Sequence, residues 1–277
     1  MRFGVHIRTD RGLLKALDQA RELRCETVQL FSSSPTRWAR KPLDPDQASR
    51  FAEKAASLDI RPIIIHTPYL LNLASPDDVI WSKSRDALAD AVARAAMLGG
   101  DMVVTHMGSH KGSGSELGLR RVAESLRFAL DAHDSVTVAL ELGAGGGSSV
   151  GSRFDEVARI IDYLAGHPRV GIAIDTAHLY AAGYDVSNSE GVNAMFAELD
   201  RLVGVERLKL IHLNDTPALL GSHRDRHHHI GRGRIGREGF RAIVNHPASR
   251  GLPGIIETPA EHGWDARNLR VLRRLVS

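Results

Sequence analysis

The sequence predicts a (β/α)8 TIM barrel, a closed ring of eight parallel strands in which a helix follows each strand. Eight short apolar, β-branched runs alternate along the chain with longer amphipathic stretches. Many of these runs are apolar at nearly every position, as expected for parallel strands that are buried on both faces. The length of 277 residues suits a single barrel domain spanning 1–277. An open doubly wound sheet is the alternative, and the eight repeated units favour closure.

The expected strands are the apolar runs at 3–7, 27–31, 62–66, 102–106, 136–141, 170–175, 207–212 and 254–257. Asp44 and Pro45 are typical of a helix start, as N-cap and first helical residue. Ser75 and Pro76 predict a second start of the same kind, for a helix over 76–98 that ends at Gly99-Gly100. Further helices are expected near 12–23, 115–132, 152–165, 188–203, 236–246 and 264–275.

The composition is that of an ordinary globular protein, with 43% hydrophobic and 25% charged residues. Cys25 is the single cysteine, which excludes a disulfide framework within the chain. No apolar run approaches membrane-spanning length, and the N-terminus lacks the features of a secretory signal. We therefore expect a cytoplasmic protein. The net charge of +3 permits nucleic-acid binding without arguing for it, and the 14 histidines are the stronger signal.

Six consecutive strands end in residue types that bind metal ions. In a barrel these carboxyl ends converge on the face where active sites are built. The six residues, from the third strand to the eighth, are His66, His106, Glu141, Asp175, His212 and Glu257. The loops just beyond the strands add three more, which are His178, Asp225 and His227. The sequence therefore predicts nine candidate ligands around one cleft.

Four carboxylates packed together without partners would repel one another and resist burial. Divalent cations remove that conflict, and a mixed His/Asp/Glu set without cysteine suits zinc, or manganese in one or more sites. Nine ligands are too many for one ion and enough for about three. Three divalent ions outweigh four carboxylates, so the site should attract an anion such as a phosphodiester.

Several segments resemble the endonuclease IV family of apurinic/apyrimidinic endonucleases. The resemblance spans nearly the whole chain, in the family order, and its most specific motifs are IDTAHLYAAGYD (174–185), HLND (212–215) and DRHHHIG (225–231). Further matches are TVQLF (27–31), HTPYLLNLAS (66–75), THMGSH (105–110), ALELGAG (139–145) and IIETP (255–259).

The resemblance implies a trinuclear zinc site in a TIM barrel. His66 and His106 would hold one ion, with Glu141 bridging to a second. Asp175, His212 and Glu257 would complete the second site, and the third would consist of His178, Asp225 and His227. The implied activity is hydrolysis of the DNA phosphodiester 5′ to an abasic site, leaving a 3′-hydroxyl, with trimming of blocked 3′ ends. Among the nine residues, Glu141 and Glu257 are the candidate catalytic carboxylates.

The resemblance also implies that the protein bends double-stranded DNA and flips out the abasic nucleotide. Tyr69 stands where an intercalating tyrosine is expected, and Arg37, displaced by one residue, is the candidate second inserting residue. Arg226 and Arg232 are further candidates for DNA contact, although Arg232 replaces an acidic residue of many relatives. Leu142 follows Glu141 where the family often has a polar residue, which removes one possible hydrogen-bonding partner of the ligands.

Some interpretations stay open. His6 either supports the metal site or has an ordinary structural role, and His228 and His229 are either solvated or in contact with phosphate. Glu141, Asp175, His212 and Glu257 alone would be enough for a single-ion sugar isomerase, which would leave the other five ligands unexplained. A DNA-damage binding protein without turnover is the third hypothesis. We expect a monomer, because a cleft that wraps bent DNA needs a free rim.

Overall fold

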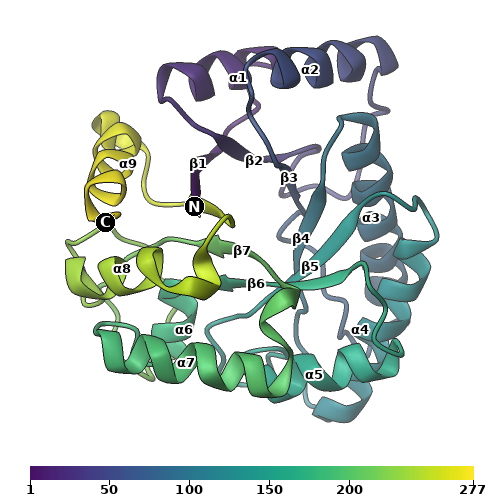
Figure 1. Cartoon of the computed structure of the whole chain (residues 1–277). Coiled ribbons are helices and arrows are strands. Elements are labelled where there is room, and N and C mark those ends of the chain that lie inside the picture. The colour runs from purple at the N-terminus through teal and green to yellow at the C-terminus, as the bar shows by residue number, and fades with distance from the viewer.

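The computed structural model describes all residues, 1–277, and contains a closed barrel of eight parallel strands that pair in chain order, β1 with β2 through to β8 with β1. Figure 1 shows the helices arranged around these strands. The strands are β1 (Arg2–Ile7), β2 (Thr27–Phe31), β3 (Ile63–His66), β4 (Met102–His106), β5 (Thr137–Glu141), β6 (Val170–Asp175), β7 (Leu208–His212) and β8 (Pro253–Ile256). The predicted fold class is confirmed.

The α-helices follow the expected order, with one addition. They are α1 (Leu13–Glu22), α2 (Pro45–Ser57), α3 (Asp78–Met97), α4 (Ser115–Leu130), α5 (Phe154–Tyr163), α6 (Thr176–Ala182), α7 (Ser189–Leu202), α8 (Gly236–Asn245) and α9 (Trp264–Leu275). Asp44 caps α2 as predicted, because its side chain accepts a hydrogen bond from the Asp46 amide. None of the helices is both long and apolar enough to cross a membrane.

The predicted start of the third helix is wrong by two residues. Asp77, and not Ser75, is the N-cap of α3, and its carboxylate accepts hydrogen bonds from the amides of Val79 and Ile80. The Ser75 hydroxyl instead accepts a hydrogen bond from the Asp77 amide at 3.2 Å. Ser75 and Pro76 thus form a turn before the helix, because a carboxylate two residues later competes successfully for the free amides.

The core has two parts. A cluster of 64 buried residues fills the space between the strands and the helices. A separate cluster of seven lies inside the barrel: Ile64, Met102, Val104, Ala139, Ala173, Leu210 and Ile255. Six of the seven stand two positions before the six strand-end ligands predicted from the sequence. Because side chains two apart on a strand point to the same face, this inner apolar layer directs those six ligands toward the barrel axis.

Candidate metal centre

The strand register brings the predicted ligands together at the carboxyl end of the barrel. His106 pairs with Glu141 across β4 and β5, and Asp175 pairs with His212 across β6 and β7. Glu257 lies one residue beyond the end of β8, where its amide donates a hydrogen bond to the Asn214 side chain at 2.7 Å. Adjacent strands in a parallel sheet are about 4.8 Å apart, so ligands on neighbouring strand ends can share an ion.

Ligand atoms form three overlapping groups, in each of which all atoms lie within 4.8 Å of one another. The first contains His66, His106 and Glu141. The Nε2 atoms of His66 and His106 lie 3.2 and 3.4 Å from the same oxygen of Glu141. One carboxylate oxygen thus faces two imidazoles, as a shared ligand would.

The second group contains Glu141, Asp175, His212 and Glu257. Nδ1 of His212 lies 3.0 Å from Glu141, 3.7 Å from Glu257 and 4.0 Å from Asp175. Glu141 therefore belongs to two groups, which is the bridging position that the family resemblance implies. Glu141, Asp175 and His212 are fully buried, so their charges are poorly screened by solvent.

The third group contains Asp175, His178 and His227. The predicted ligand Asp225 lies at its edge, 3.2 Å from Nε2 of His178 and 3.3 Å from Nε2 of His227, on a side chain that is 60% exposed. His178 was expected in a loop, but it lies in the first turn of α6. This short helix was missed because Asp175, itself a candidate ligand, also caps it by accepting hydrogen bonds from the Ala177 and His178 amides.

Three candidate histidine ligands use Nδ1 in a hydrogen bond to a backbone carbonyl. Nδ1 of His66 donates to the Thr67 carbonyl at 2.7 Å and Nδ1 of His178 to the Leu142 carbonyl at 3.1 Å. Nδ1 of His227 donates to the Glu257 carbonyl at 3.2 Å. Each bond leaves Nε2 facing the carboxylates. Such bonds fix the tautomer of metal-binding histidines, and the Leu142 backbone supplies one although its side chain is apolar.

His212 uses the opposite nitrogen, because Nε2 donates to the Gln29 side chain at 2.8 Å and Nδ1 faces the second group. Gln29 also donates to Glu257 at 2.6 Å. His6, whose role the sequence left open, lies 2.9 Å from the same Glu257 oxygen. Asn214 donates to Asp175 at 2.6 Å. Gln29 and Asn214 were missed as site residues. Each lies within a quoted motif, TVQLF (27–31) and HLND (212–215), but only the fold shows which ligand each one contacts.

The electrostatics fit a site built for cations. Although burial alone would lower the pKa of His212 and His227, the neighbouring carboxylates raise both to about 9. Burial would raise the pKa of Glu141, but the surrounding histidines hold it well below its ordinary value. The Nε2 atom of His227 is buried without a hydrogen-bond partner. Buried carboxylates, oriented imidazoles and an orphaned nitrogen are a donor set that divalent metal ions would satisfy.

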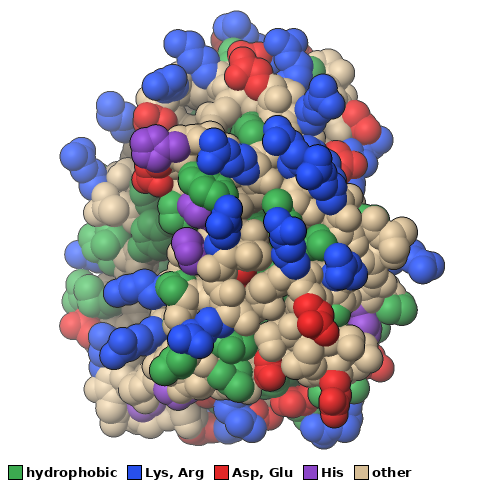
Figure 2. All heavy atoms as spheres, turned by 90° about the vertical axis from the view of Figure 1, so that its left-hand side faces the viewer, with side chains coloured by type: hydrophobic (Ala, Val, Ile, Leu, Met, Phe, Trp, Pro, Cys, Tyr) green, Lys and Arg blue, Asp and Glu red, His purple; other side chains and the backbone are tan.

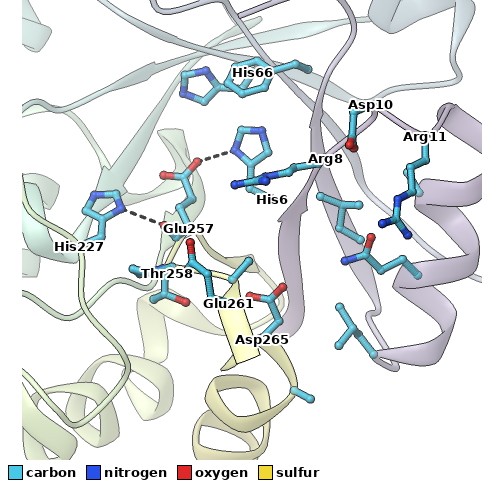
Figure 3. A pocket seen from close by; sticks show the side chains of 18 of the residues that line it. His6, Arg8, Asp10, Arg11, His66, His227, Glu257, Thr258, Glu261 and Asp265 are labelled. Carbon is cyan, nitrogen blue, oxygen red and sulfur yellow. Dashed lines mark hydrogen bonds and ion pairs between the residues drawn. The ribbon is translucent and has the colours of Figure 1, made fainter. Parts of the chain in front are cut away.

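The centre opens into a cavity of about 1180 Å³ whose lining includes His66, His106, His178 and Arg226. Figure 3 shows His6 and His227 on either side of Glu257 at this opening. On the side of the molecule seen in Figure 2, Lys and Arg side chains are spread widely, with histidines among them. A cavity of this size can admit an extended ligand, and its lining carries imidazoles, cations such as Arg8 and Arg11, and carboxylates such as Asp10 and Glu261.

Of the four candidate DNA-contacting residues, Tyr69 and Arg226 line the cavity, and Arg37 and Arg232 do not. Tyr69 is 65% exposed, and its ring lies 5.2 Å from Phe31 and 6.3 Å from His66. Arg226 lines the cavity. Arg232 lies over the Trp264 ring. Arg37 is exposed and does not line the cavity.

Comparison with known proteins gives the same family over the whole chain. The xylose isomerase-like TIM barrel family matches residues 17–275. A probable endonuclease 4 of Methanoculleus marisnigri is 44% identical, with 98% of both chains covered, and one of Chloroflexus aurantiacus is 42% identical, with 99% of this chain and 98% of the relative covered. The crystal structure of endonuclease IV from Thermus thermophilus superposes with a TM-score of 0.89 at 35% identity, covering 99% of this chain and 98% of that one. The chain therefore belongs to the endonuclease IV family of xylose isomerase-like TIM barrels.

Proposed function

We propose that the protein is a zinc-dependent apurinic/apyrimidinic endonuclease of base excision repair. It would hydrolyse the DNA phosphodiester 5′ to an abasic site, leave a 3′-hydroxyl and trim blocked 3′ ends. The observation that carries the proposal is the set of three overlapping ligand groups, joined through Glu141 and Asp175, at the base of an open cavity. Phosphodiester hydrolysis commonly uses clustered ions about 4 Å apart.

The residues that would hold the ions are those of the three groups, with Asp225 added to the third. When bound, divalent ions supply Lewis acidity, which lowers the pKa of water and stabilises charge on phosphate oxygens. Imidazole-rich sites favour zinc, and the carboxylate-rich second group also suits manganese. A sugar isomerase would need the second group alone, which leaves the other two groups without a purpose.

The role of the protein's own residues is to hold the carboxylates in place. The side chains of Gln29 and His6 both contact one oxygen of Glu257. The Asn214 side chain donates a hydrogen bond to the Asp175 carboxylate and accepts one from the backbone amide of Glu257. These bonds fix the orientation of the carboxylates before a substrate arrives, which lowers the reorganisation needed during reaction. Glu141 and Glu257 are the catalytic carboxylates in this proposal.

Residues that line the cavity or are exposed near it would contact the DNA. An exposed aromatic ring such as Tyr69 can enter the base stack where a base is missing, where little stacking has to be broken. The exposed Arg37 would be the second inserting residue. Arg226 in the cavity and the exposed Arg232 would contact the DNA and help to position the duplex.

The test is a nicking assay on a duplex with one abasic analogue. We expect a cut on its 5′ side, which a chelator suppresses. Glu257→Gln should retain the fold and lose roughly 100-fold or more of the nicking rate, because an amide is a weaker ligand than a carboxylate. Glu124→Gln, an exposed change on α4, is the matched control and should cut at the normal rate. Near-normal cutting by Glu257→Gln, or binding of the duplex without any nick by the intact protein, would refute the proposal.

A further inference from the structure

Four side chains beside the metal centre form an aromatic and cationic cluster, which we call the tryptophan platform: His229, Arg232, Trp264 and Arg267. The His229 ring stacks on Trp264 with centroids 3.8 Å apart and an angle of 8° between the planes. The guanidinium carbons of Arg267 and Arg232 lie 5.1 and 5.9 Å from the centre of the same indole ring. The platform thus combines residues of the β7–α8 segment with the first turns of α9.

The platform is fixed to the metal centre by one buried amide. Asn268 donates to the Thr258 hydroxyl at 2.7 Å and accepts from the Ile230 amide at 3.1 Å. Its nitrogen also lies 3.3 Å from the His229 ring. Thr258 follows the ligand Glu257, and His229 stands two residues after the ligand His227. Asn268 therefore links the platform to the segments that carry the ligands Glu257 and His227.

The two arginines of the platform have no acidic partner. Neither Arg232 nor Arg267 forms an ion pair in the structure, although many arginines elsewhere in the chain do. The His229 ring contributes a stacking contact with the indole. Two guanidinium groups that form no ion pair and lie against one indole make a cationic surface.

We infer that the tryptophan platform binds a backbone phosphate of the DNA strand that enters the metal centre. This inference rests on the proposed function, since it takes DNA as the partner. Planar guanidinium groups match phosphate oxygens in bidentate geometry, and the indole restricts the positions that the guanidiniums adopt. His229 covers one face of the indole and the guanidiniums lie over the ring, so a phosphate fits this surface better than a stacked base.

The test compares Arg232→Gln/Arg267→Gln with Arg250→Gln/Arg274→Gln. The control pair removes the same charge from exposed arginines that lie before β8 and at the end of α9, at the opposite end of the barrel. Binding of the metal-loaded proteins to a fluorescent undamaged duplex is measured at KCl concentrations from roughly 50 to 300 mM. In the platform variant, the magnitude of the slope of log K against log salt concentration should fall by about 0.9, the value for one phosphate contact. Its binding should also be several-fold weaker. The control should keep the wild-type slope.

The outcomes separate this inference from the proposed function. An unchanged slope in the platform variant would overturn the inference, whether or not the abasic duplex is nicked. A reduced slope would support it even if no abasic duplex is nicked, in which case only the proposed activity fails. Binding of inorganic phosphate alone that disappears in the variant, with an unchanged DNA slope, would assign the platform to free phosphate and would also overturn the inference.

Discussion

At the scale of the residue, Asp265 is a buried carboxyl group that the metal centre does not use. It lies in the first turn of α9 with 6% of its surface exposed, and its Oδ1 atom has no hydrogen-bond partner. Burial raises the pKa of Asp265 to about 6. The negative charge of Glu261 adds to this effect, and the positive charge of Arg8 opposes it. Because the pKa in the folded state exceeds that in the unfolded chain, the carboxyl group destabilises the fold at neutral pH, and this penalty decreases as the pH falls from 6 to below 4.

Asp265→Asn should therefore stabilise the protein at pH 7.5, by about 1–2 kcal/mol after allowance for solvent screening and the lost helix-dipole interaction. The amide keeps an acceptor at the same position and removes the unpaired charge. Urea unfolding at pH 7.5 and pH 4.5 measures the difference, which should be smaller at the lower pH. Asp134→Asn, on an exposed turn, should change neither value. A destabilised Asp265→Asn protein at pH 7.5 would show that the carboxylate has a favourable partner in solution.

At the scale of the element, the start of α3 shows how two adjacent capping residues divide their roles. Asp77 satisfies two of the first free amides of the helix, at 2.8 and 3.0 Å. Ser75 holds only the turn that leads into it. Because α3 packs closely on α4, loss of this cap would loosen one side of the barrel.

Asp77→Ala should lower the free energy of unfolding by about 1 kcal/mol, since it leaves two helical amides without a side-chain acceptor. Ser75→Ala should have a smaller effect, because that hydroxyl caps no helical amide. Equilibrium denaturation of both variants under one condition gives the comparison. An equal or greater loss for Ser75→Ala would mean that the turn, and not the cap, stabilises the start of the helix.

At the scale of the whole molecule, folding and metal binding use separate sets of residues. The 64-residue cluster between strands and helices contains none of the nine ligands, and the seven-residue inner layer lies beneath them. The barrel can therefore keep its secondary structure without ions, while the ligand groups carry unfavourable carboxylate repulsion that protonated histidines partly offset.

Removal of metal by a chelator should leave the far-ultraviolet circular dichroism largely intact, lower Tm by several degrees and abolish nicking. Addition of zinc at pH 7.5 should restore about three ions per chain and release protons, because the neighbouring carboxylates raise the pKa of His212 and His227 to about 9 and that of His178 well above its ordinary value. Metal binding should then weaken as the pH falls. Metal analysis and an indicator dye provide the two measurements, and a content of one ion would favour the single-ion isomerase.

The sequence predicted the parts of this architecture that follow from periodicity. Six of the seven inner-layer residues precede a ligand by two positions, and the metal-binding residue types at six consecutive strand ends were enough to find those six ligands from the sequence. Helix α6 escaped prediction because its cap is also a ligand and its seven residues are too few for a clear helical pattern. Gln29, Asn268 and the stacking of His229 on Trp264 depend on contacts between distant segments, which no local pattern in the chain reports.

The closure of β8 onto β1 also has a consequence for the time at which activity can arise during protein synthesis. In a growing chain, His66, His106 and Glu141 are made well before Glu257, which is the last of the nine ligands to be made. Glu257 then meets His6 and Gln29 from the first two strands. A ribosome-bound or truncated chain that lacks the eighth strand therefore cannot complete the second ligand group, so unfinished chains are kept from cutting DNA.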